Sequence, residues 1–434
     1  MMRVITLFSG YDSQCLALRR LGVDFDLVAW CEIDANARRA HNILFPEYRN
    51  RNIGDISKVD WSLFMKMRKE KSIDYFNHNF LLFAPEQTDD GSGHIDLLTY
   101  SSPCQDFSRA GLQRGGEKGS GTRSCLLWEC ERAIEALRPK YLVFENVPEL
   151  VCKKFKPTFD AWCDVLRSYG YRNYWQFLNA KNYGVPQNRK RIFMVSVHGD
   201  GEPYCFPEPF KLTCQLKDVL EEHVQEKYYL KDSTISMMIR HNEYHANGGG
   251  KFTVTDTDGV ANVIQADHCL RQGTNIIAEK YVLGWTRDAK GNVVDRHPVD
   301  VANCVTSGKR DNTQNYVVEP VIKQVGNCYN EKTNPQYGRV YSSDGIAPTL
   351  TMMEGGNAQP KVVVGDRLRR LTERELFRLM GVDDADIDKL LSSGISKTQL
   401  SKMAGNSIVV DVLFHLFRKM FIETENDDAQ LTLF

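Results

Sequence analysis

The sequence predicts an α/β fold whose open sheet is followed by a second, β-rich domain. Apolar runs of strand length alternate with stretches of helical spacing over the first two hundred residues, which is typical of a mostly parallel sheet covered by helices. From about Gly199 the composition changes, because prolines cluster at 203, 207 and 209 and short β-branched runs then alternate with Asn, Gly and Thr. The 434 residues suffice for two domains.

The first elements are a strand, a turn and a helix. Residues 4–8 form an apolar run that predicts a strand, and Ser9-Gly10 predicts a turn. Leucines then recur near helical spacing until Gly22, a residue typical of a helix C-terminus. Residues 25–30 predict the second strand.

Carboxylates after the second strand point to a nucleoside cofactor. Glu32 and Asp34 follow the glycine turn by about twenty residues, where dinucleotide-type folds bind a ribose hydroxyl. Asp55 follows a further strand candidate and can accept a hydrogen bond from an adenine amine. Only Gly10 is present where a pyrophosphate would need two more glycines, which disfavours NAD or FAD and favours S-adenosylmethionine. The alternative is that Glu32 and Asp34 merely cap a helix.

Three reactive groups occur at the ends of predicted strands. Cys104 follows the apolar run 95–100, Glu145 follows the buried run 141–144, and Arg189 and Arg191 precede the run 192–197. Alone, each is more often a buried thiol, a cap or solvated surface. Together they are expected at one edge of one sheet, since interposed helices return the chain to that edge.

The amino-acid composition narrows the class of protein but does not identify a binding partner. The formal net charge of −1 shows no global signature of nucleic-acid binding, so any such surface must be local. The twelve cysteines lack paired metal-ligand spacing, which predicts a reduced, cytoplasmic protein without a metal site. Neither a signal-peptide start nor an apolar run of membrane-spanning length is apparent, so no membrane partner is expected.

As an ordered set, the motifs resemble those of the cytosine-5 DNA methyltransferase family of bacterial or phage type. The resemblance covers the first two hundred and the last seventy residues. Its blocks are Phe8-Ser9-Gly10, Glu32-Ile33-Asp34, Gly54-Asp55-Ile56, Pro103-Cys104-Gln105-Asp106-Phe107-Ser108, Thr122-Arg123-Ser124 through Leu126, Glu145-Asn146-Val147, Gln187 to Arg191, Arg369 to Glu375, and Gly405-Asn406-Ser407-Ile408-Val409.

The resemblance implies a fold and a domain division. The fold is a Rossmann-like S-adenosylmethionine-dependent methyltransferase sheet with a β-rich target-recognition domain. Residues 1–200 would form the catalytic and cofactor-binding domain, and 201–394 the target-recognition domain with its hinge. Residues 395–434 would carry a C-terminal helix, starting near Ser407, back to the first domain. Thr372 and Glu375 predict a capping box that opens a further helix.

The resemblance also implies the chemistry. Cys104 would add to carbon 6 of a cytosine, Glu145 would contact the ring nitrogen and amine, and Arg191, with Arg189 less firmly, would hold the base oxygen. Carbon 5 would then accept a methyl group from S-adenosylmethionine, and the target base must leave the duplex for this. The expected cofactor-binding residues are Phe8, Gly10, Tyr11, Glu32, Ile33, Asp55, Ile56, Pro103, Leu126, Asn406 and Ile408.

Double-stranded DNA is the expected partner, and the chain is expected to act as a monomer. The glycine-rich, basic segment 108–121 suits a loop that closes over DNA, or else a plain surface loop. A weak repeat of about forty residues in the middle of the chain offers loops for base contacts. The candidate DNA contacts are Arg109, Arg114, Lys118, Arg271, Gln272, Lys309 and Arg310.

Two departures from the family pattern stand out. Asp12-Ser13 replaces the usual glycine pair, which is tolerable because Ser is small and Asp accepts left-handed backbone. Residues 58–94 form a longer connection than expected, treated as an insertion.

Two alternatives remain open at this point. A transfer-RNA cytosine methyltransferase would share the nucleophile, acid and arginine blocks, but the large middle domain favours DNA. A catalytically silent DNA-binding homologue is the other alternative, and the intact Cys104, Glu145 and Arg191 argue against it. The target sequence and the existence of a restriction partner are left open.

Overall fold

The computed structural model divides the chain into two compact units. The first unit comprises residues 1–224, 344–359 and 371–434, and the second comprises 225–343 and 360–370. The residues that the structure describes are 1–70, 94–103, 106–107, 114–200, 202–230, 282–287, 293–299, 324–327, 339–350, 361–364 and 367–423.

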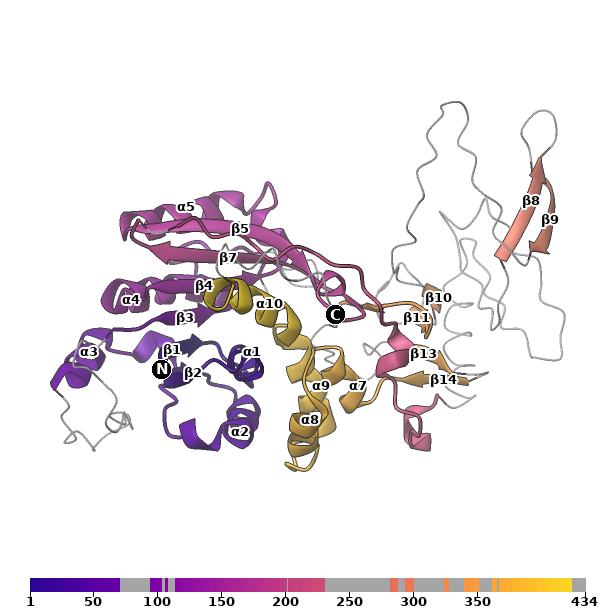
Figure 1. Cartoon of the computed structure of the whole chain (residues 1–434), viewed down its shortest axis with the longest axis horizontal. Helices are drawn as coiled ribbons and strands as arrows, with labels where there is room; N and C mark the ends of the chain where they lie inside the picture. The colour runs from indigo at the N-terminus through magenta and orange to yellow at the C-terminus, as the bar shows by residue number, and fades with distance from the viewer. Residues whose placement is uncertain are drawn as a thin grey trace. The chain divides into compact units, whose positions relative to one another are not determined.

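A six-stranded sheet forms the centre of the first unit (Figure 1). Its order is β2 (Phe25–Cys31), β1 (Met2–Leu7), β3 (Leu97–Tyr100), β4 (Tyr141–Asn146), β7 (Lys190–His198) and β5 (Tyr171–Asn179). The first four strands are parallel, whereas β7 runs antiparallel to both of its neighbours. The carboxyl ends of the parallel strands and the start of β7 therefore lie at the same edge, which confirms the predicted α/β fold class.

The sheet register aligns one row of residues along that edge. Leu7 pairs with both Cys31 and Tyr100, and Tyr100 pairs with Phe144. The next residue of each strand is therefore the first beyond the parallel ladder. These four residues are Glu32, Phe8, Ser101 and Glu145.

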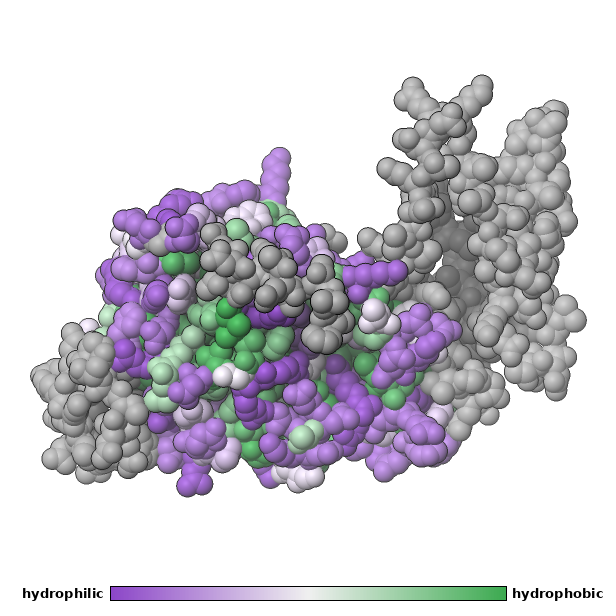
Figure 2. Space-filling view, viewed as in Figure 1, coloured by the Kyte–Doolittle hydropathy of each residue, from purple (hydrophilic) through white to green (hydrophobic). Residues whose placement is uncertain are grey.

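Helices cover the two faces of the sheet. One core cluster joins alternate strand residues to α3 (Trp61–Glu70), α4 (Leu127–Leu137) and α5 (Lys156–Ser168). On the other face, α1 (Ser13–Leu21) packs against α10 (Val410–Phe421), whose Phe421 ring meets Tyr141 of β4. Figure 2 shows a mostly hydrophilic face with apolar side chains gathered around the position of α10.

Part of the predicted insertion at 58–94 belongs to the core. Trp61 and Phe64 of α3 are buried in the cluster beneath the sheet. Residues 71–93 lie outside the described residues. The strand expected before Asp55 does not form. In its place, Asn52 makes an isolated bridge to Trp30.

Four helices at the C-terminal end belong to the first unit: α7 (Glu373–Arg378), α8 (Asp384–Leu391), α9 (Lys397–Asn406) and α10. The capping box of Thr372 and Glu375 is present at the start of α7, as predicted. The helix expected to start near Ser407 is present, and it starts three residues further along. Ser407 is the C-cap of α9, and a new helix begins at Val410.

The second unit is β-rich, as predicted. It contains a sheet of β10 (Gln324–Asn327), β11 (Arg339–Ser342), β13 (Lys361–Val364) and β14 (Arg367–Arg370), and a hairpin of β8 (Val282–Arg287) and β9 (Val293–Val299). Its compact part ends before Leu371, earlier than the predicted boundary at 394, because α7 and α8 bury Leu376, Phe377 and Ile387 within the first unit.

Shorter elements complete the described structure. In the first unit, β6 (Gln187–Asn188) pairs in parallel with β12 (Ala347–Pro348), and α2 (Ala35–Leu44) follows β2. Seven short 3-10 turns are η1 (Pro46–Tyr48), η2 (Ile56–Lys58), η3 (Arg123–Leu126), η4 (Pro148–Val151), η5 (Ala180–Asn182), η6 (Leu216–Val219) and η7 (Glu226–Tyr228), counted within the residues the structure describes.

One stretch of the described chain, residues 397–421, is long and apolar enough to cross a membrane by length and composition alone. This differs from the expectation that no apolar run is of membrane-spanning length. The stretch corresponds to α9 and α10, and 67% of its most apolar window is buried inside the protein. A core helix passes the same test, so this stretch is weak evidence for a membrane span.

Replacing Gly381 with alanine is expected to destabilise the protein more than replacing Gly22. Both glycines have φ of +73°, so both variants bear the strain of left-handed backbone, about 1–2 kcal/mol. A Cβ on Gly381 would also lie 1.9 Å from Oδ2 of Asp411, whereas a Cβ on Gly22 meets nothing within 4 Å. Urea unfolding midpoints would measure the difference, and equal losses would contradict the steric argument.

Candidate active site

The loop after β1 adopts a left-handed backbone at three positions. Phe8, Gly10 and Asp12 have φ values of 57°, 59° and 70°. Asp12 occupies the place of a family glycine, and its buried carboxylate accepts hydrogen bonds from Thr6 Oγ1 at 2.8 Å and Cys15 N at 3.1 Å. Its Oδ2 also lies 3.4 Å from Nε2 of His41. The expectation that aspartate accepts the left-handed conformation here is confirmed.

Glu32 and Asp34 take different roles. The Glu32 carboxylate accepts hydrogen bonds from the backbone N–H groups of Gly10, Ile33 and Asp34 at 2.8–3.0 Å. Burial raises the pKa of Glu32, and these three N–H donors act against that rise. Asp34 caps α2 through Asn36 N and Ala37 N. The capping alternative therefore describes Asp34, whereas Glu32 holds the turn after β1.

A cavity opens at the carboxyl edge, between the loop after β1 and the end of α9. Six predicted cofactor residues line it, namely Phe8, Gly10, Tyr11, Glu32, Asn406 and Ile408. The Tyr11 hydroxyl lies 2.5 Å from Ser407 Oγ, which ties the loop to the end of α9. Burial raises the pKa of Tyr11, so the phenol is neutral at pH 7.

The other five predicted cofactor residues do not line this cavity: Ile33, Asp55, Ile56, Pro103 and Leu126. Ile33 is 67% exposed beside Glu32, and Asp55 caps η2 through Ser57. The cavity wall also includes residues that sequence reasoning missed. They are Ser9, Ser13, Gln14, Ala37, Ser101, Gln399, Lys402, Met403 and Ser407. Asp34, which the sequence suggested beside Glu32, also lines the cavity. Spacing on α9 (399, 402, 403, 406) marks one helical face, but only the fold shows what that face meets.

Cys104 and Gln105 lie outside the described residues, but the chain on both sides of them is held by one hydroxyl. Ser124 Oγ donates to Pro103 O at 2.7 Å and accepts from Asp106 N at 3.2 Å. The Asp106 carboxylate accepts in return from Ser124 N at 3.2 Å. Pro103 and Asp106, on either side of Cys104 in the sequence, are thus both bonded to Ser124 of η3.

The basic residues of the neighbouring segment have partners within the protein. Arg114 Nε donates to Asp106 at 2.9 Å. Burial alone would raise the pKa of Asp106, but Arg114 and Ser124 outweigh it and lower the pKa. Lys118 pairs with Glu131 at 2.6 Å and lies over the ring of Trp128. Arg109 lies outside the described residues, as do the remaining candidate DNA contacts, Arg271, Gln272, Lys309 and Arg310.

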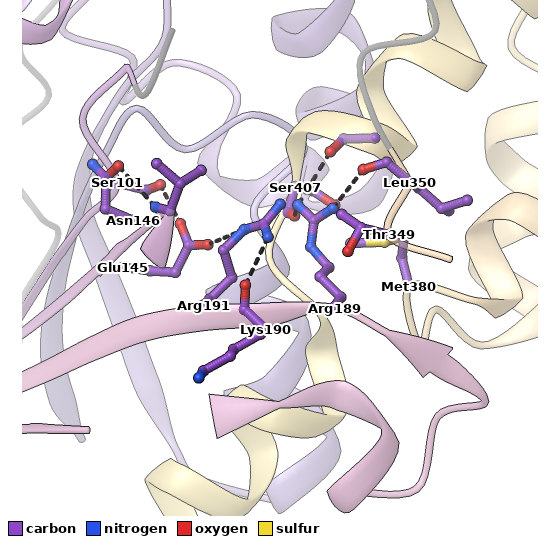
Figure 3. A network of polar contacts seen from close by, with 12 residues as sticks. Ser101, Glu145, Asn146, Arg189, Lys190, Arg191, Thr349, Leu350, Met380 and Ser407 are labelled. Atoms are coloured by element: carbon purple, nitrogen blue, oxygen red, sulfur yellow. Dashed lines mark hydrogen bonds and ion pairs between the residues drawn. The ribbon is translucent and has the colours of Figure 1, made fainter. Parts of the chain in front are cut away.

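Glu145 is held at both carboxyl oxygens. Ser101 Oγ donates to its Oε2 at 2.7 Å, and Arg191 Nε lies 3.3 Å from its Oε1 (Figure 3). Arg191 reaches Glu145 because β7 is antiparallel to β4, so the start of β7 lies beside the end of β4. Glu145 is 6% exposed, so this buried carboxylate is paired with a cation, as buried charges generally are.

Arg189 points to a different part of the molecule. Its guanidinium donates to three backbone carbonyls, those of Leu350 at 2.7 Å, Gly405 at 3.1 Å and Ser407 at 2.7 Å (Figure 3). The chain turns at Arg189, whose N–H bonds to Gln187 O, before β7 begins at Lys190. This turn breaks the alternation that would place both arginines on one face, so the described contacts of Arg189 are with backbone carbonyls, and its contact with the base stays a prediction.

The comparisons with known proteins agree on a family. A model of the C-5 cytosine-specific DNA methylase family matches residues 2–422. The chain is 32% identical to the Type II methyltransferase M2.ScrFI of Lactococcus lactis subsp. cremoris, over 97% of this chain and 99% of that protein. It is 28% identical to the orphan methyltransferase M.SPRI of Bacillus phage SPR, over 99% of each.

A solved structure supports the fold separately. The Dnmt2 methyltransferase of S. pombe superposes with a TM-score of 0.54 at 15% identity, covering 96% of each chain. Likeness at this identity speaks for the fold alone, whereas the family match extends over nearly the whole sequence. The chain therefore belongs to the C-5 cytosine-specific DNA methylase family, and it is a DNA cytosine-5 methyltransferase.

Proposed function

We propose that the chain transfers a methyl group from S-adenosylmethionine to carbon 5 of a flipped-out cytosine in a specific double-stranded DNA sequence, through a covalent adduct with Cys104. The second unit would recognise the target sequence, with Arg271, Gln272, Lys309 and Arg310 as its proposed DNA contacts. The chain would act as a monomer.

The observation that carries the proposal is the row of residues at the carboxyl edge. Glu32, Phe8 and Ser101 line the cavity, and Ser101 also bonds to Glu145. A cofactor cavity and a buried, cation-paired carboxylate are thus in direct contact through one side chain. This is the arrangement that a reaction between a bound donor and a base contacted by Glu145 requires, because reacting atoms must come within about 3–3.5 Å.

The cavity residues fit S-adenosylmethionine by their chemistry. Glu32 offers a half-buried carboxylate for ribose hydroxyls, and Phe8 and Ile408 offer apolar surface. The turn has one glycine and so lacks the cradle that a pyrophosphate needs. When bound, the cofactor would supply an electrophilic methyl group.

The protein's own residues would do the rest. A Cys104 thiolate would bond to carbon 6 of the cytosine, which makes carbon 5 nucleophilic. Glu145 would contact the ring nitrogen and the exocyclic amine, and would stabilise the charge that develops there. After methyl transfer, loss of the carbon 5 proton expels the thiol and restores the aromatic ring. Arg191 would compensate the charge of Glu145.

Methylation mapping tests this function directly. DNA from cells that express the chain should contain 5-methylcytosine at one short sequence that vector-only cells leave unmodified. Bisulfite or long-read sequencing would identify that sequence. In vitro, the purified protein should transfer labelled methyl to duplex DNA that contains the sequence, with total RNA from the same cells as the comparison. Transfer to RNA alone would contradict the proposal.

Replacing Glu32 with alanine should weaken S-adenosylmethionine binding by roughly 10- to 100-fold, the value of hydrogen bonds to a charged group. Because burial raises the pKa of Glu32, affinity in the unaltered protein should also fall as the pH drops through mildly acidic values and the carboxylate gains a proton. Titration calorimetry would measure both effects. The exposed Glu47→Ala variant is the control, and unchanged affinity in Glu32→Ala would refute the ribose assignment.

A further inference from the structure

We propose that Ser101 is a positioning residue for Glu145: its hydroxyl orients the carboxyl group that contacts the target base and stays bonded to it whether the carboxyl is charged or protonated. This inference rests on the proposed function. It concerns a side chain that sequence reasoning did not select.

The sheet fixes the contact between the two side chains. Tyr100 of β3 and Phe144 of β4 are the last pair of the parallel ladder. Ser101 and Glu145 follow them directly, so neighbouring backbones deliver both side chains to the same place. The resulting distance of 2.7 Å between Ser101 Oγ and Glu145 Oε2 is typical of a strong hydrogen bond to a carboxylate.

The next pair of residues along the same strands has its own bonds. Asn146 Nδ2 donates to Ser102 O at 3.2 Å and to Ser102 Oγ at 3.3 Å. Each of the two serines before Pro103 therefore forms hydrogen bonds with one residue at the end of β4. Ser102 accepts hydrogen bonds from the side-chain amide of Asn146, and Ser101 donates one to the carboxylate of Glu145.

Ser101 and Arg191 hold Glu145 in chemically different ways. The guanidinium of Arg191 can only donate hydrogen bonds, so it favours the charged carboxylate. A hydroxyl can donate to a carboxylate and can also accept from a carboxylic acid. The contact with Ser101 therefore survives a change in the protonation of Glu145, which the proposed stabilisation of the ring nitrogen requires. A carboxylate has about four lone-pair positions, so these two contacts leave others for the base.

The same hydroxyl links the carboxyl group to the cofactor side. Ser101 lines the cavity together with Phe8 and Glu32, its neighbours in the edge row. A carboxyl held from that direction cannot rotate into the cavity without losing its bond to Ser101. We therefore expect loss of the hydroxyl to slow the chemistry more than it weakens the binding of either substrate.

The test compares Ser101→Ala with Ser101→Thr, which keeps a hydroxyl. Single-turnover methyl transfer should slow roughly 10- to 100-fold in Ser101→Ala, the loss expected for one hydrogen bond to a charged group. Ser101→Thr should recover most of the rate. The cofactor Kd, the DNA Kd and the urea midpoint of Ser101→Ala should stay close to those of the unaltered protein. Ser196→Ala is the matched control, since Ser196 is a buried serine of the same sheet without a hydrogen-bond partner among the described residues.

A double variant separates positioning from general weakening. In a Glu145→Ala background, where the group that Ser101 positions is absent, the Ser101→Ala change should cost less than about twofold, because residues that act as a unit are non-additive. A full additional loss in that background would overturn the inference, and so would an unchanged rate in Ser101→Ala alone. Absence of DNA methylation by the unaltered protein would instead mean that the proposed function has failed.

Discussion

Cys104→Ala is expected to abolish DNA methylation, lowering single-turnover methyl transfer by at least about 10⁴-fold, the scale seen when a nucleophile is removed. Without a thiolate at carbon 6, carbon 5 of cytosine stays too electron-poor to accept a methyl group. S-adenosylmethionine binding should be retained within a few-fold, because the substitution leaves Phe8, Glu32 and the other described residues of the cavity wall unchanged. Labelled methyl transfer and titration calorimetry would measure the two effects on the same preparation.

Two other cysteines of the catalytic domain cannot take over this role. Burial raises the pKa of Cys31 to about 12 and that of Cys163 to about 11, so both stay protonated at neutral pH. The exposed Cys152 provides the control, and Cys152→Ala should methylate DNA normally. A duplex that carries 5-fluorocytosine at the target should trap the unaltered protein as a covalent complex stable to denaturation. Methylation by Cys104→Ala would defeat the assignment.

Alanine substitutions of the two arginines in the Gln187-to-Arg191 block are expected to impair different properties. Arg189→Ala should mainly lower stability, whereas Arg191→Ala should mainly lower the rate of methyl transfer. Arg189→Ala should destabilise the first unit by about 3 kcal/mol or more, since it leaves the buried carbonyls of Leu350 and Gly405 and the part-buried carbonyl of Ser407 without their charged donor. Arg191→Ala should also lower the unfolding midpoint, because it leaves the buried Glu145 carboxylate without its cation, but its main effect should be to slow methyl transfer by about 10²-fold or more, as loss of an electrostatic contact in an active site does. Its removal deprives Glu145 of its charge partner.

Stability and methyl-transfer rate measured on both variants would show whether each arginine acts on folding or on catalysis. Urea unfolding gives the stability of each, and single-turnover methyl transfer at a low temperature, where both are folded, gives the rate. Arg189→Lys and Arg191→Lys keep the charge but lose the planar fork of donors, so each should show a milder form of its own defect. If Arg189→Ala proved stable and catalytically inactive, both arginines would have to contact the base.

Local sequence was enough for the elements whose signals are local. Gly22 ends α1 with φ of +73°, and Thr372 with Glu375 forms the capping box of α7. In each case the residues that make the interaction lie within one helical turn, so the chain carries the whole signal. The order of the motifs also sufficed for the family, because many short blocks in a fixed order are specific together.

Distant contacts were beyond the reach of the sequence. The distinction between Asp34 as a cap and Glu32 as a ligand of the turn depends on Gly10, which is 22 residues from Glu32. The wall of the cavity formed by α9 comes from almost four hundred residues further along the chain. The sequence placed the start of the last helix near Ser407, where the backbone does turn, but the position of Val410 as the first residue of α10 follows from the structure.

What the sequence determined by itself is the fold class and the family, because strand periodicity and short ordered motifs are properties of local segments. Only the tertiary structure shows which side chains contact each of the candidate site residues. The antiparallel direction of β7 places Arg191 beside Glu145, and the β3–β4 register places Ser101 beside Glu145. The turn at Arg189 directs its guanidinium toward backbone carbonyls instead. Strand direction and register are set by long-range packing, which no local pattern encodes.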